Sequence, residues 1–399
     1  MKREKVTATN AKPRNRNHSM QTKCPYAKKC GGCKYQGTEY TKQLQIKTDE
    51  VKGHLSRFGK VHPVCKMEHP YHYRNKVHAV FHYNKGQIIS GTYQEGSHKV
   101  VSVEECNIED VKAAPIVATI RKLLKSFKIK IYNEDTGYGL FRHVLIRTGR
   151  TSGQIMVVLV VASPVFPSRK NFTKALLKEH PEITTVVMNI NDRHTSMILG
   201  NREETLYGKG FIEDSLCDKV FRISPKSFYQ VNPVQTEKLY RKAIALAGLT
   251  GSETVLDAYC GIGTIGIIAA DAAKEVIGVE LNKDAVRDAR GNARRNGVKN
   301  ISFYENDAGE FMRKLAIEGV AIDTVFMDPP RAGSSKMFMD AIFKLAPKKV
   351  VYVSCNPETM ARDIAYMQKN GYRTNEFYPY DMFPHTGHVE TVVLMSRTM

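Results

Sequence analysis

Residues 255–266 read Val-Leu-Asp-Ala-Tyr-Cys-Gly-Ile-Gly-Thr-Ile-Gly. The apolar start of this stretch is typical of a buried parallel strand, and Gly261 and Gly263 allow a tight turn into a following helix. Strand-like and helix-like segments then alternate to residue 396. This alternation predicts an α/β fold with a doubly wound, mostly parallel sheet of the Rossmann-like type.

Two acids flank the glycine-rich turn and indicate its ligand. Glu280 ends the next predicted strand, where a carboxylate can bind both hydroxyls of a ribose. NAD is the first alternative, but Asp257 precedes the glycines and would repel a diphosphate. An acid there suits an ammonium group. S-adenosyl-L-methionine carries an amino group and a ribose but no phosphate, so we expect it as the cofactor.

A second predicted strand, residues 322–327, runs into Asp328-Pro329-Pro330-Arg331. An acid and two prolines at the carboxyl end of such a strand form a rigid lip where ligands bind. Enzymes that methylate exocyclic amines of bases typically carry an aromatic residue after this motif. Arg331 stands in that place and therefore argues against amine methylation.

The next predicted strand ends in Ser354-Cys355-Asn356-Pro357, which places Cys355 at the same edge of the sheet. We expect a catalytic thiolate there, with its pKa lowered by the helix that follows. Glu390 opens the last predicted strand and is a candidate proton acceptor. A thiolate that adds to carbon 6 of uracil makes carbon 5 nucleophilic toward a methyl donor, and a base then removes the carbon-5 proton.

Five stretches together resemble the RNA uracil-C5 methyltransferases, namely residues 228–232, 256–263, 328–331, 354–357 and 388–390. The resemblance implies Cys355 as the nucleophile and Glu390 as the proton acceptor. It implies a class I S-adenosylmethionine-dependent methyltransferase domain. The implied cofactor contacts are Gln230, Tyr259, Thr264, Glu280, Asn306 and Asp328.

Three cysteines, Cys24, Cys30 and Cys33, are closely spaced near the start of the chain. A fourth ligand would complete a site for zinc or a [4Fe–4S] cluster, and Cys65, Cys106 and Cys217 are the candidates by residue type. The ribosomal branch of the resembled family carries a [4Fe–4S] cluster on this cysteine pattern, with a fourth ligand that corresponds to Cys106. The resemblance therefore favours 23S rRNA as the substrate, with the same reaction on tRNA as the alternative.

Basic residues gather in the first part of the chain. Of 60 Lys and Arg and 40 Asp and Glu in 399 residues, the first 250 hold 42 and 21. This excess of positive charge indicates a nucleic-acid partner. The longest apolar run, residues 155–162, is too short to span a bilayer, and the basic N-terminus is not a secretory signal. We expect a cytoplasmic monomer that binds RNA and no membrane.

We divide the chain into three parts. Residues 1–23 are predicted to be a disordered basic tail. Residues 24–230 alternate in ways typical of hairpins, including strands at 185–191 and 195–199, and predict an α+β iron–sulfur and RNA-binding domain. Residues 231–399 form the methyltransferase domain. Family members commonly begin with a small β-barrel that binds RNA, and the 23 residues before Cys24 leave no room for it, so we expect the tail and residues 40–150 to grip RNA.

Three other classes of protein remain as alternatives. A non-catalytic RNA-binding protein would need a broken site, yet Cys355, Glu390 and Asp328 are all present. An amine methyltransferase conflicts with Arg331 and Cys355. An iron–sulfur electron carrier has no use for the cofactor pocket. We expect any cluster to be structural, because uracil methylation needs no electron.

Overall fold

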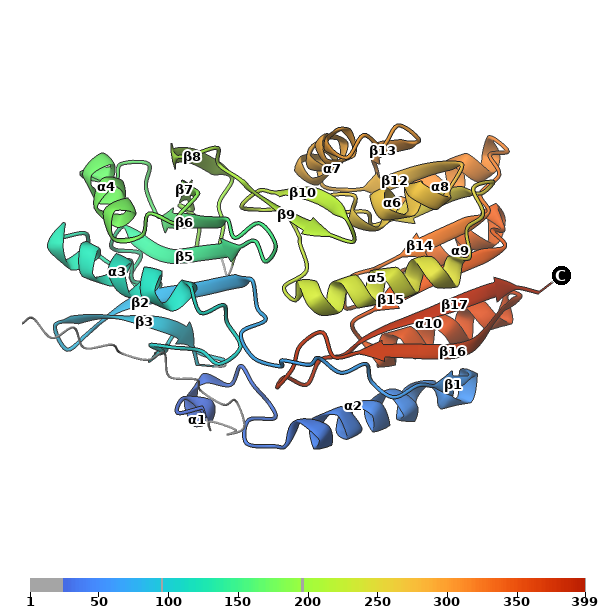
Figure 1. Ribbon diagram of the computed structural model, residues 1–399, viewed down its shortest axis with the longest axis horizontal. Coiled ribbons are helices and arrows are strands. Elements are labelled where there is room, and N and C mark those ends of the chain that lie inside the picture. The colour runs from blue at the N-terminus through green and yellow to red at the C-terminus, as the bar shows by residue number, and fades with distance from the viewer. Residues whose placement is uncertain (1–23, 95, 195–196, 399) are drawn as a thin grey trace, which may run out of the picture.

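The computed structural model describes residues 24–94, 96–194 and 197–398. The tail predicted for residues 1–23 therefore lies outside the described residues. Two large sheets lie side by side along the molecule, each covered by helices (Figure 1). No helix among the described residues is long and apolar enough to cross a membrane.

The first sheet has seven strands in the order β4-β3-β2-β5-β6-β7-β8, and every pairing except β6 with β7 is antiparallel. Apolar side chains of alternate positions form a core against two helices on one face of this sheet. The strands are β2 (Lys76–Asn84), β3 (Gln87–Tyr93), β4 (Val100–Ser102), β5 (Phe141–Thr148), β6 (Ile155–Val161), β7 (Thr185–Ile190) and β8 (Arg202–Tyr207), and the helices are α3 (Ala113–Ser126) and α4 (Arg169–Glu179). Short helix α1 (Ala27–Cys30) precedes this sheet in the chain.

Two short strands and one helix connect the two sheets. β9 (Ile212–Leu216) and β10 (Lys219–Ile223) form a hairpin, and α5 (Pro233–Ala247) follows. Asn232 caps α5 by accepting a hydrogen bond from the Gln235 N–H, and Pro233 fits the first turn because its missing N–H has no helical partner there.

The second sheet has eight strands in the order β1-β16-β17-β15-β14-β11-β12-β13. Strand β17 runs antiparallel to both neighbours, and the other pairings are parallel. The strands are β1 (Lys60–Val61), β11 (Thr254–Ala258), β12 (Glu275–Glu280), β13 (Ile301–Glu305), β14 (Thr324–Met327), β15 (Lys349–Ser354), β16 (Tyr372–Tyr380) and β17 (Glu390–Arg397). The helices are α6 (Thr264–Ala269), α7 (Lys283–Arg295), α8 (Ala308–Ile317), α9 (Lys336–Leu345) and α10 (Pro357–Lys369). This architecture confirms the α/β fold predicted from residues 255–266.

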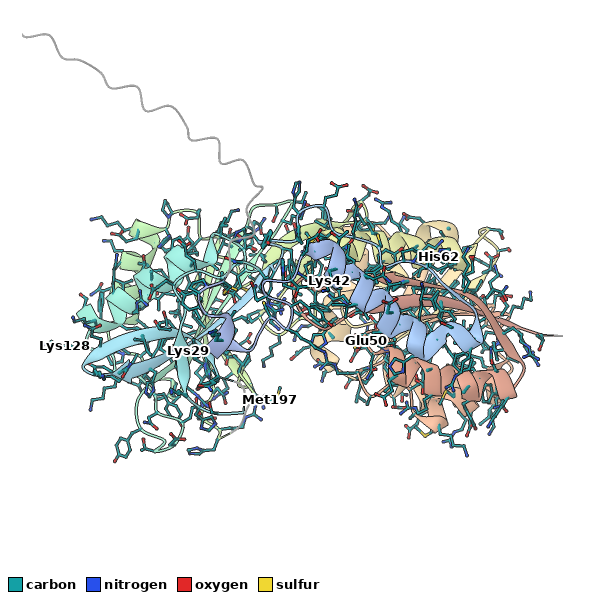
Figure 2. The ribbon with its side chains drawn as sticks, turned by 90° about the horizontal axis from the view of Figure 1, so that it is seen from below. Lys29, Lys42, Glu50, His62, Lys128 and Met197 are labelled. Carbon is teal, nitrogen blue, oxygen red and sulfur yellow. The ribbon has the colours of Figure 1, made fainter. Side chains whose placement is uncertain are left out.

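The N-terminal helix α2 (Tyr40–Leu55) packs on the second sheet although it lies far from that sheet in sequence. Val51 and Leu55 are buried in the core of this sheet, and β1 pairs in parallel with β16. Figure 2 shows α2, with Lys42 and Glu50 labelled, lying along the second half of the molecule.

The region between β7 and β10 departs from the sequence prediction. Residues 197–199 of the predicted strand 195–199 form no strand, while residues 195 and 196 lie outside the described residues. Asn191 donates hydrogen bonds from Nδ2 to the backbone oxygens of Met197 (2.7 Å) and Ile198 (3.1 Å), which fold this segment as a loop. The strand that follows is β8, whose polar Arg-Glu-Glu start carries little β signal.

Candidate active site

The carboxyl ends of the parallel strands meet at one edge of the second sheet, and most of the predicted site residues lie there. Tyr259 follows β11, Glu280 ends β12, Asn306 follows β13, Asp328 follows β14 and Cys355 follows β15. Because β17 is antiparallel, its first residue, Glu390, lies at the same edge. We name this set of strand ends the catalytic rim.

Cys355 and Glu390 are neighbours on the catalytic rim. The register of β15 and β17 pairs Ser354 with Thr391, so the residue after β15 lies opposite the first residue of β17. Glu390 is only 4% exposed, whereas Cys355 is partly exposed. The rim therefore places a reachable thiol beside a carboxyl group that bulk water does not reach.

The expected lowering of the Cys355 pKa is wrong for the structure. Burial raises the pKa of this thiol, and the carboxylates of Glu390 and Asp328 raise it further. Arg331 acts in the opposite direction through its charge and a hydrogen bond to the thiol. Any lowering of the Cys355 pKa by the dipole of helix α10 is smaller than the increase caused by burial and the two nearby acids.

Arg331 is the residue of the rim that the sequence prediction left out of the site. Its Nη2 lies 2.7 Å from His388 Nδ1, and its backbone oxygen accepts a hydrogen bond from Thr359 Oγ1 at 3.3 Å. These contacts hold the guanidinium near Cys355 and Glu390, and its charge lowers the pKa of both groups. The signal was present in the sequence, because Arg331 completes the Asp-Pro-Pro-Arg motif.

Asp328 and Glu390 form a pair of neighbouring acids. Burial raises the pKa of Asp328 to about 7. Burial also raises the pKa of Glu390 well above its usual range, and the Asp328 charge adds to this effect. Two close carboxyl groups in a site with little water resist simultaneous ionisation, so the pair retains a proton near neutral pH.

The glycine-rich turn and Glu280 form one wall of a cavity of about 350 Å³. Glu280 Oε2 accepts a hydrogen bond from the Gly261 N–H at 3.1 Å, which fixes the carboxylate beside the turn. Gly263 has a φ of +82°, and an added Cβ there would lie 2.8 Å from the Phe303 ring, so this turn requires glycine. Phe228, 67% exposed, lines the same cavity from the segment before α5.

Tyr259 in the turn and Asp257 in β11 have unusual surroundings. Tyr259 has a φ of +65°, a left-handed backbone that a residue with a bulky side chain rarely adopts. Its ring packs against Phe338 at a centroid distance of 5.1 Å. Asp257 is buried and accepts a hydrogen bond from the Gly266 N–H at 2.7 Å, while burial raises its pKa to about 7.

The structure places the remaining predicted cofactor contacts in two locations. Thr264 starts α6 and hydrogen-bonds Tyr240, a buried residue of α5 whose hydroxyl also feels the charges of Asp328 and Glu390. The backbone N–H of Asn306 donates a hydrogen bond to the backbone oxygen of Glu280 at 3.1 Å. Gln230 is buried, and its backbone oxygen accepts a hydrogen bond from Asn75 Nδ2 at 3.2 Å. Gln230 is thus held at the junction of the two sheets, and the others are held at the rim.

The loop before Glu390, residues 381–388, is braced by the N-terminal part of the chain. Lys47, fully buried, bonds Asp381 Oδ1 at 2.6 Å and the Phe383 oxygen at 3.0 Å. Gln43 accepts a hydrogen bond from the His385 N–H at 3.1 Å, and the Tyr35 N–H donates to the His385 oxygen at 3.0 Å. Helix α2 and the segment before it therefore position the loop that leads into Glu390.

The four predicted metal ligands line one small cavity of about 30 Å³. These residues are Cys24, Cys30, Cys33 and Cys106. Within the part of the chain that the structure describes, however, no three or more Cys, His, Asp or Glu side chains are arranged to hold a metal ion. The donor chemistry fits a thiolate-bound cluster, because no carboxylate lines this cavity, but the thiols do not converge on a metal position.

The fold and the rim are those of a Rossmann-like, S-adenosylmethionine-dependent methyltransferase, and comparisons with known proteins agree. A family model described as tRNA (Uracil-5-)-methyltransferase matches residues 39–398. The chain therefore belongs to this family of RNA uracil-C5 methyltransferases. S-adenosyl-L-methionine is accordingly its cofactor and RNA its substrate.

Relatives and solved structures extend this likeness. The chain is 44% identical over 384 residues to an uncharacterised RNA methyltransferase of Caldanaerobacter subterraneus, covering 95% of this chain and 85% of that protein. A protein of the same description from Clostridium acetobutylicum is also 44% identical, covering 94% and 83%. The tRNA (uracil-54, C5)-methyltransferase of Pyrococcus abyssi in complex with S-adenosyl-L-homocysteine has a TM-score of 0.74 at 30% identity, covering 90% of this chain and 83% of that one.

Proposed function

We propose that this enzyme methylates carbon 5 of a uridine in RNA through a covalent bond between Cys355 and carbon 6 of the base. The observation that carries the proposal is the position of Cys355 beside Glu390 on the catalytic rim, which also includes Glu280, a residue that lines the cavity of about 350 Å³. A thiol and a carboxyl group side by side supply the nucleophile and the base that this substitution needs.

The proposed reaction has two chemical stages. The Cys355 thiolate forms a bond to carbon 6, and the electron pair of the 5,6 double bond makes carbon 5 nucleophilic. Carbon 5 would then bond the methyl carbon of S-adenosyl-L-methionine, while the bond from that carbon to the sulfonium sulfur breaks and S-adenosyl-L-homocysteine leaves. Glu390 then takes the proton from carbon 5, the 5,6 double bond forms again, and the bond between sulfur and carbon 6 breaks to return the thiolate.

Arg331 and Asp328 adjust the protonation states in this scheme. Arg331 is the cation that favours the Cys355 thiolate against burial and two acids. Asp328 raises the pKa of Glu390, which makes Glu390 a stronger base once it is ionised. A base inside a buried carboxyl pair can hold the carbon-5 proton until it is passed to solvent.

The residues at the glycine-rich turn fit the cofactor. We assign the ribose hydroxyls to Glu280 and the open backbone at Gly261 to the cofactor chain, with Tyr259, Thr264 and Asn306 beside them. The family resemblance also assigns Gln230 and Asp328 to the cofactor. An added Cβ at Gly261 would meet nothing within 4 Å, so the cavity is open toward bare backbone there.

We propose in addition that Cys24, Cys30, Cys33 and Cys106 bind a [4Fe–4S] cluster with a structural role. Support comes from their shared cavity and from the backbone N–H groups of Ile108 and Glu109, which bond the Cys106 sulfur. Such hydrogen bonds to ligating sulfur are usual in iron–sulfur sites. Binding would require the thiols to close around the ions.

We propose 23S rRNA as the substrate, on the cysteine pattern, and a cytoplasmic monomer as the active form. A specific observation favours tRNA as the second candidate, because the solved neighbour with a TM-score of 0.74 acts on uracil 54 of tRNA.

One experiment separates these substrates. Ribosomal RNA and tRNA from cells with and without this protein are digested, and 5-methyluridine is mapped by mass spectrometry. Loss of the modification from 23S rRNA alone supports the proposal, and loss from tRNA alone transfers the function to tRNA. Unchanged 5-methyluridine in both, with purified enzyme inactive on both, would overturn the proposed function.

A further inference from the structure

The outer helices of the seven-stranded sheet carry a strongly cationic surface. Helices α3 and α4 contain seven Lys and Arg and one acid, Glu179. They pack against each other, with Phe127 and Phe172 in edge contact at 5.5 Å. In Figure 1 both helices lie at the end of the molecule opposite the C-terminal strands. This surface is remote in the fold from the catalytic rim.

Most of these cations lack an acid partner. Arg121 pairs with Glu104 at 2.6 Å and Arg169 with Glu204 at 2.7 Å. The exposed lysines have no carboxylate within 4.0 Å among the residues that the structure describes; they are Lys122, Lys125, Lys170, Lys174 and Lys178. Like charges gathered on one surface repel, and a bound polyanion relieves this repulsion.

Three of these lysines form a row along one face of α4. Lys170, Lys174 and Lys178 are spaced four residues apart, so they follow one another at intervals of roughly 6 Å along the helix. The first turn of α4 contains Arg169 and Lys170 and no acid, although the positive end of the helix dipole favours an anion there. The lysine row and the positive end of the helix both suit a bound ligand with regularly spaced negative charges.

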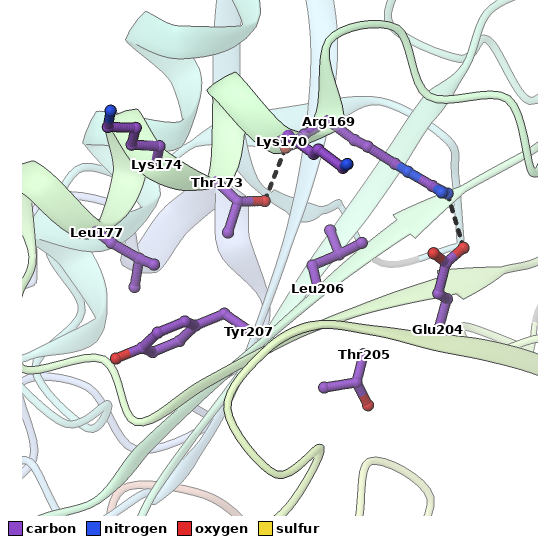
Figure 3. Close-up of a pocket in the computed structure, with 9 residues that line it drawn as sticks. All are labelled: Arg169, Lys170, Thr173, Lys174, Leu177, Glu204, Thr205, Leu206 and Tyr207. Carbon is purple, nitrogen blue, oxygen red and sulfur yellow. Dashed lines mark hydrogen bonds and ion pairs between the residues drawn. The ribbon is translucent and has the colours of Figure 1, made fainter.

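A groove of about 460 Å³ runs beside this row, between α4 and the edge strand β8 (Figure 3). Lys170 and Lys174 line one side, and Leu206 and Tyr207 line the other. The Tyr207 ring is 46% exposed, so it can stack with a base while the lysines contact phosphates. A cationic row with an aromatic platform is the arrangement that binds single-stranded nucleic acid.

We propose that the α3–α4 surface and the α4–β8 groove form a second RNA-binding site, which holds a part of the substrate RNA away from the methylated uridine. This proposal rests on the proposed function for the identity of the substrate. An acidic protein could also satisfy the lysines, but it would leave the exposed Tyr207 ring without a stacking partner. The site adds affinity for long RNA and takes no part in the chemistry.

The test compares two triple variants with the same change in charge. Lys170→Gln/Lys174→Gln/Lys178→Gln removes the row. Lys299→Gln/Lys344→Gln/Lys369→Gln removes three exposed lysines of the second sheet's layer, which likewise have no carboxylate within 4.0 Å among the described residues. For long substrate RNA we expect the first variant to bind about tenfold more weakly at 0.1 M salt, with a log–log salt slope smaller by about 2. The control should differ little from wild type.

Catalysis provides the second readout. The first variant should raise KM for long RNA and leave kcat unchanged, and it should act like wild type on a short hairpin that contains the target uridine. Tyr207→Ala should weaken binding of long RNA about five- to tenfold, whereas Tyr138→Ala, which removes an 81% exposed ring outside the groove, should not.

Two results would overturn the second site. In one, both triple variants bind long RNA alike. In the other, only binding of a polyglutamate probe depends on Lys170, Lys174 and Lys178, which assigns the surface to a protein. The failure of the proposed function is separate, because it appears as absence of 5-methyluridine with the wild-type enzyme in the same assays.

Discussion

At the scale of single residues, the rim depends on how four charged or ionisable groups share one small space. Cys355, Glu390 and Asp328 each have a raised pKa, and Arg331 opposes the increase at the first two. The sequence predicted Cys355, Glu390 and Asp328, because each stands at a strand end. It did not predict that the Cys355 pKa is raised, since burial and two neighbouring acids follow from the order of strands β17, β15 and β14.

Glu390→Gln should trap a covalent enzyme–RNA adduct. Glutamine keeps the shape of the side chain but cannot accept the carbon-5 proton, so Cys355 cannot leave. A denaturing gel should show a shifted band that needs both RNA and S-adenosyl-L-methionine. Cys355→Ala is the control and should give neither the band nor turnover. Normal turnover by Glu390→Gln would mean that another group is the base.

Arg331→Ala should raise the pKa of Cys355 further, because it removes a cation that favours the thiolate. The rate of alkylation of Cys355 by iodoacetamide, measured against pH, should move to higher pH. The alkylation rate at pH 7 should therefore fall, because the thiolate is the reactive form and a higher pKa lowers its population. Arg313→Ala, a change on helix α8, is the control and should leave the profile unmoved. If the pH dependence of alkylation is unchanged in Arg331→Ala, then Arg331 does not stabilise the Cys355 thiolate.

The acid pair predicts a pH dependence of kcat/KM. Glu390 must be ionised to accept a proton, and burial together with the Asp328 charge raises its pKa well above the usual range of a carboxyl group. Activity should therefore rise with pH above the range in which an ordinary carboxyl group titrates, and Asp328→Asn should move this rise to lower pH by removing the charge that raises the Glu390 pKa. Asp328 is also a proposed cofactor contact, so cofactor must be saturating in the measurement. If the rise of kcat/KM with pH stays at the same pH in Asp328→Asn, then Asp328 does not raise the pKa of the base.

At the scale of elements, the parallel strands and their helices were predictable from the sequence. The packing of N-terminal elements on the C-terminal sheet was not. Local alternation predicted a strand that ends at Glu280 and a helix that follows Cys355, and β12 and α10 confirm both. Nothing in the periodicity of residues 40–61 indicates that α2 and β1 pack on the C-terminal sheet. That placement depends on contacts such as Lys47 with Asp381, which are separated by more than three hundred residues.

Lys47→Met should destabilise the protein by about 3–5 kcal/mol, because it leaves the Asp381 carboxylate buried without its cation. Urea unfolding monitored by circular dichroism measures this loss. Lys52→Met, an exposed lysine on the same helix, is the matched control and should change stability by less than about 0.5 kcal/mol. Equal effects of the two changes would show that the ion pair does not brace the loop 381–388.

At the scale of the whole molecule, the chain contains two sheets, and the excess of Lys and Arg lies in the part of the sequence that builds the first sheet. A division of labour between an RNA-binding part and a catalytic part stays a prediction from charge counts and cysteine spacing, and the direction of the side chains decides whether the thiols can bind iron. Anaerobically purified protein should be brown and hold about four irons per chain. Cys106→Ser should lose the colour and Cys65→Ser should keep it. Stoichiometric zinc without visible absorbance would refute the cluster.

The pairing of β1 with β16 also constrains how the polypeptide is made. Lys60 and Val61 must wait for Glu376 and Phe377 before they can form their ladder. While the ribosome still holds the last strands, the apolar side of α2, with Val51 and Leu55, has no core to enter. Helix α2 is therefore among the last elements to dock, and Glu390, the proposed proton acceptor, takes its place in the sheet only after synthesis of the final strand. Until then, partly made chains leave Val51 and Leu55 without the core that covers them in the finished protein.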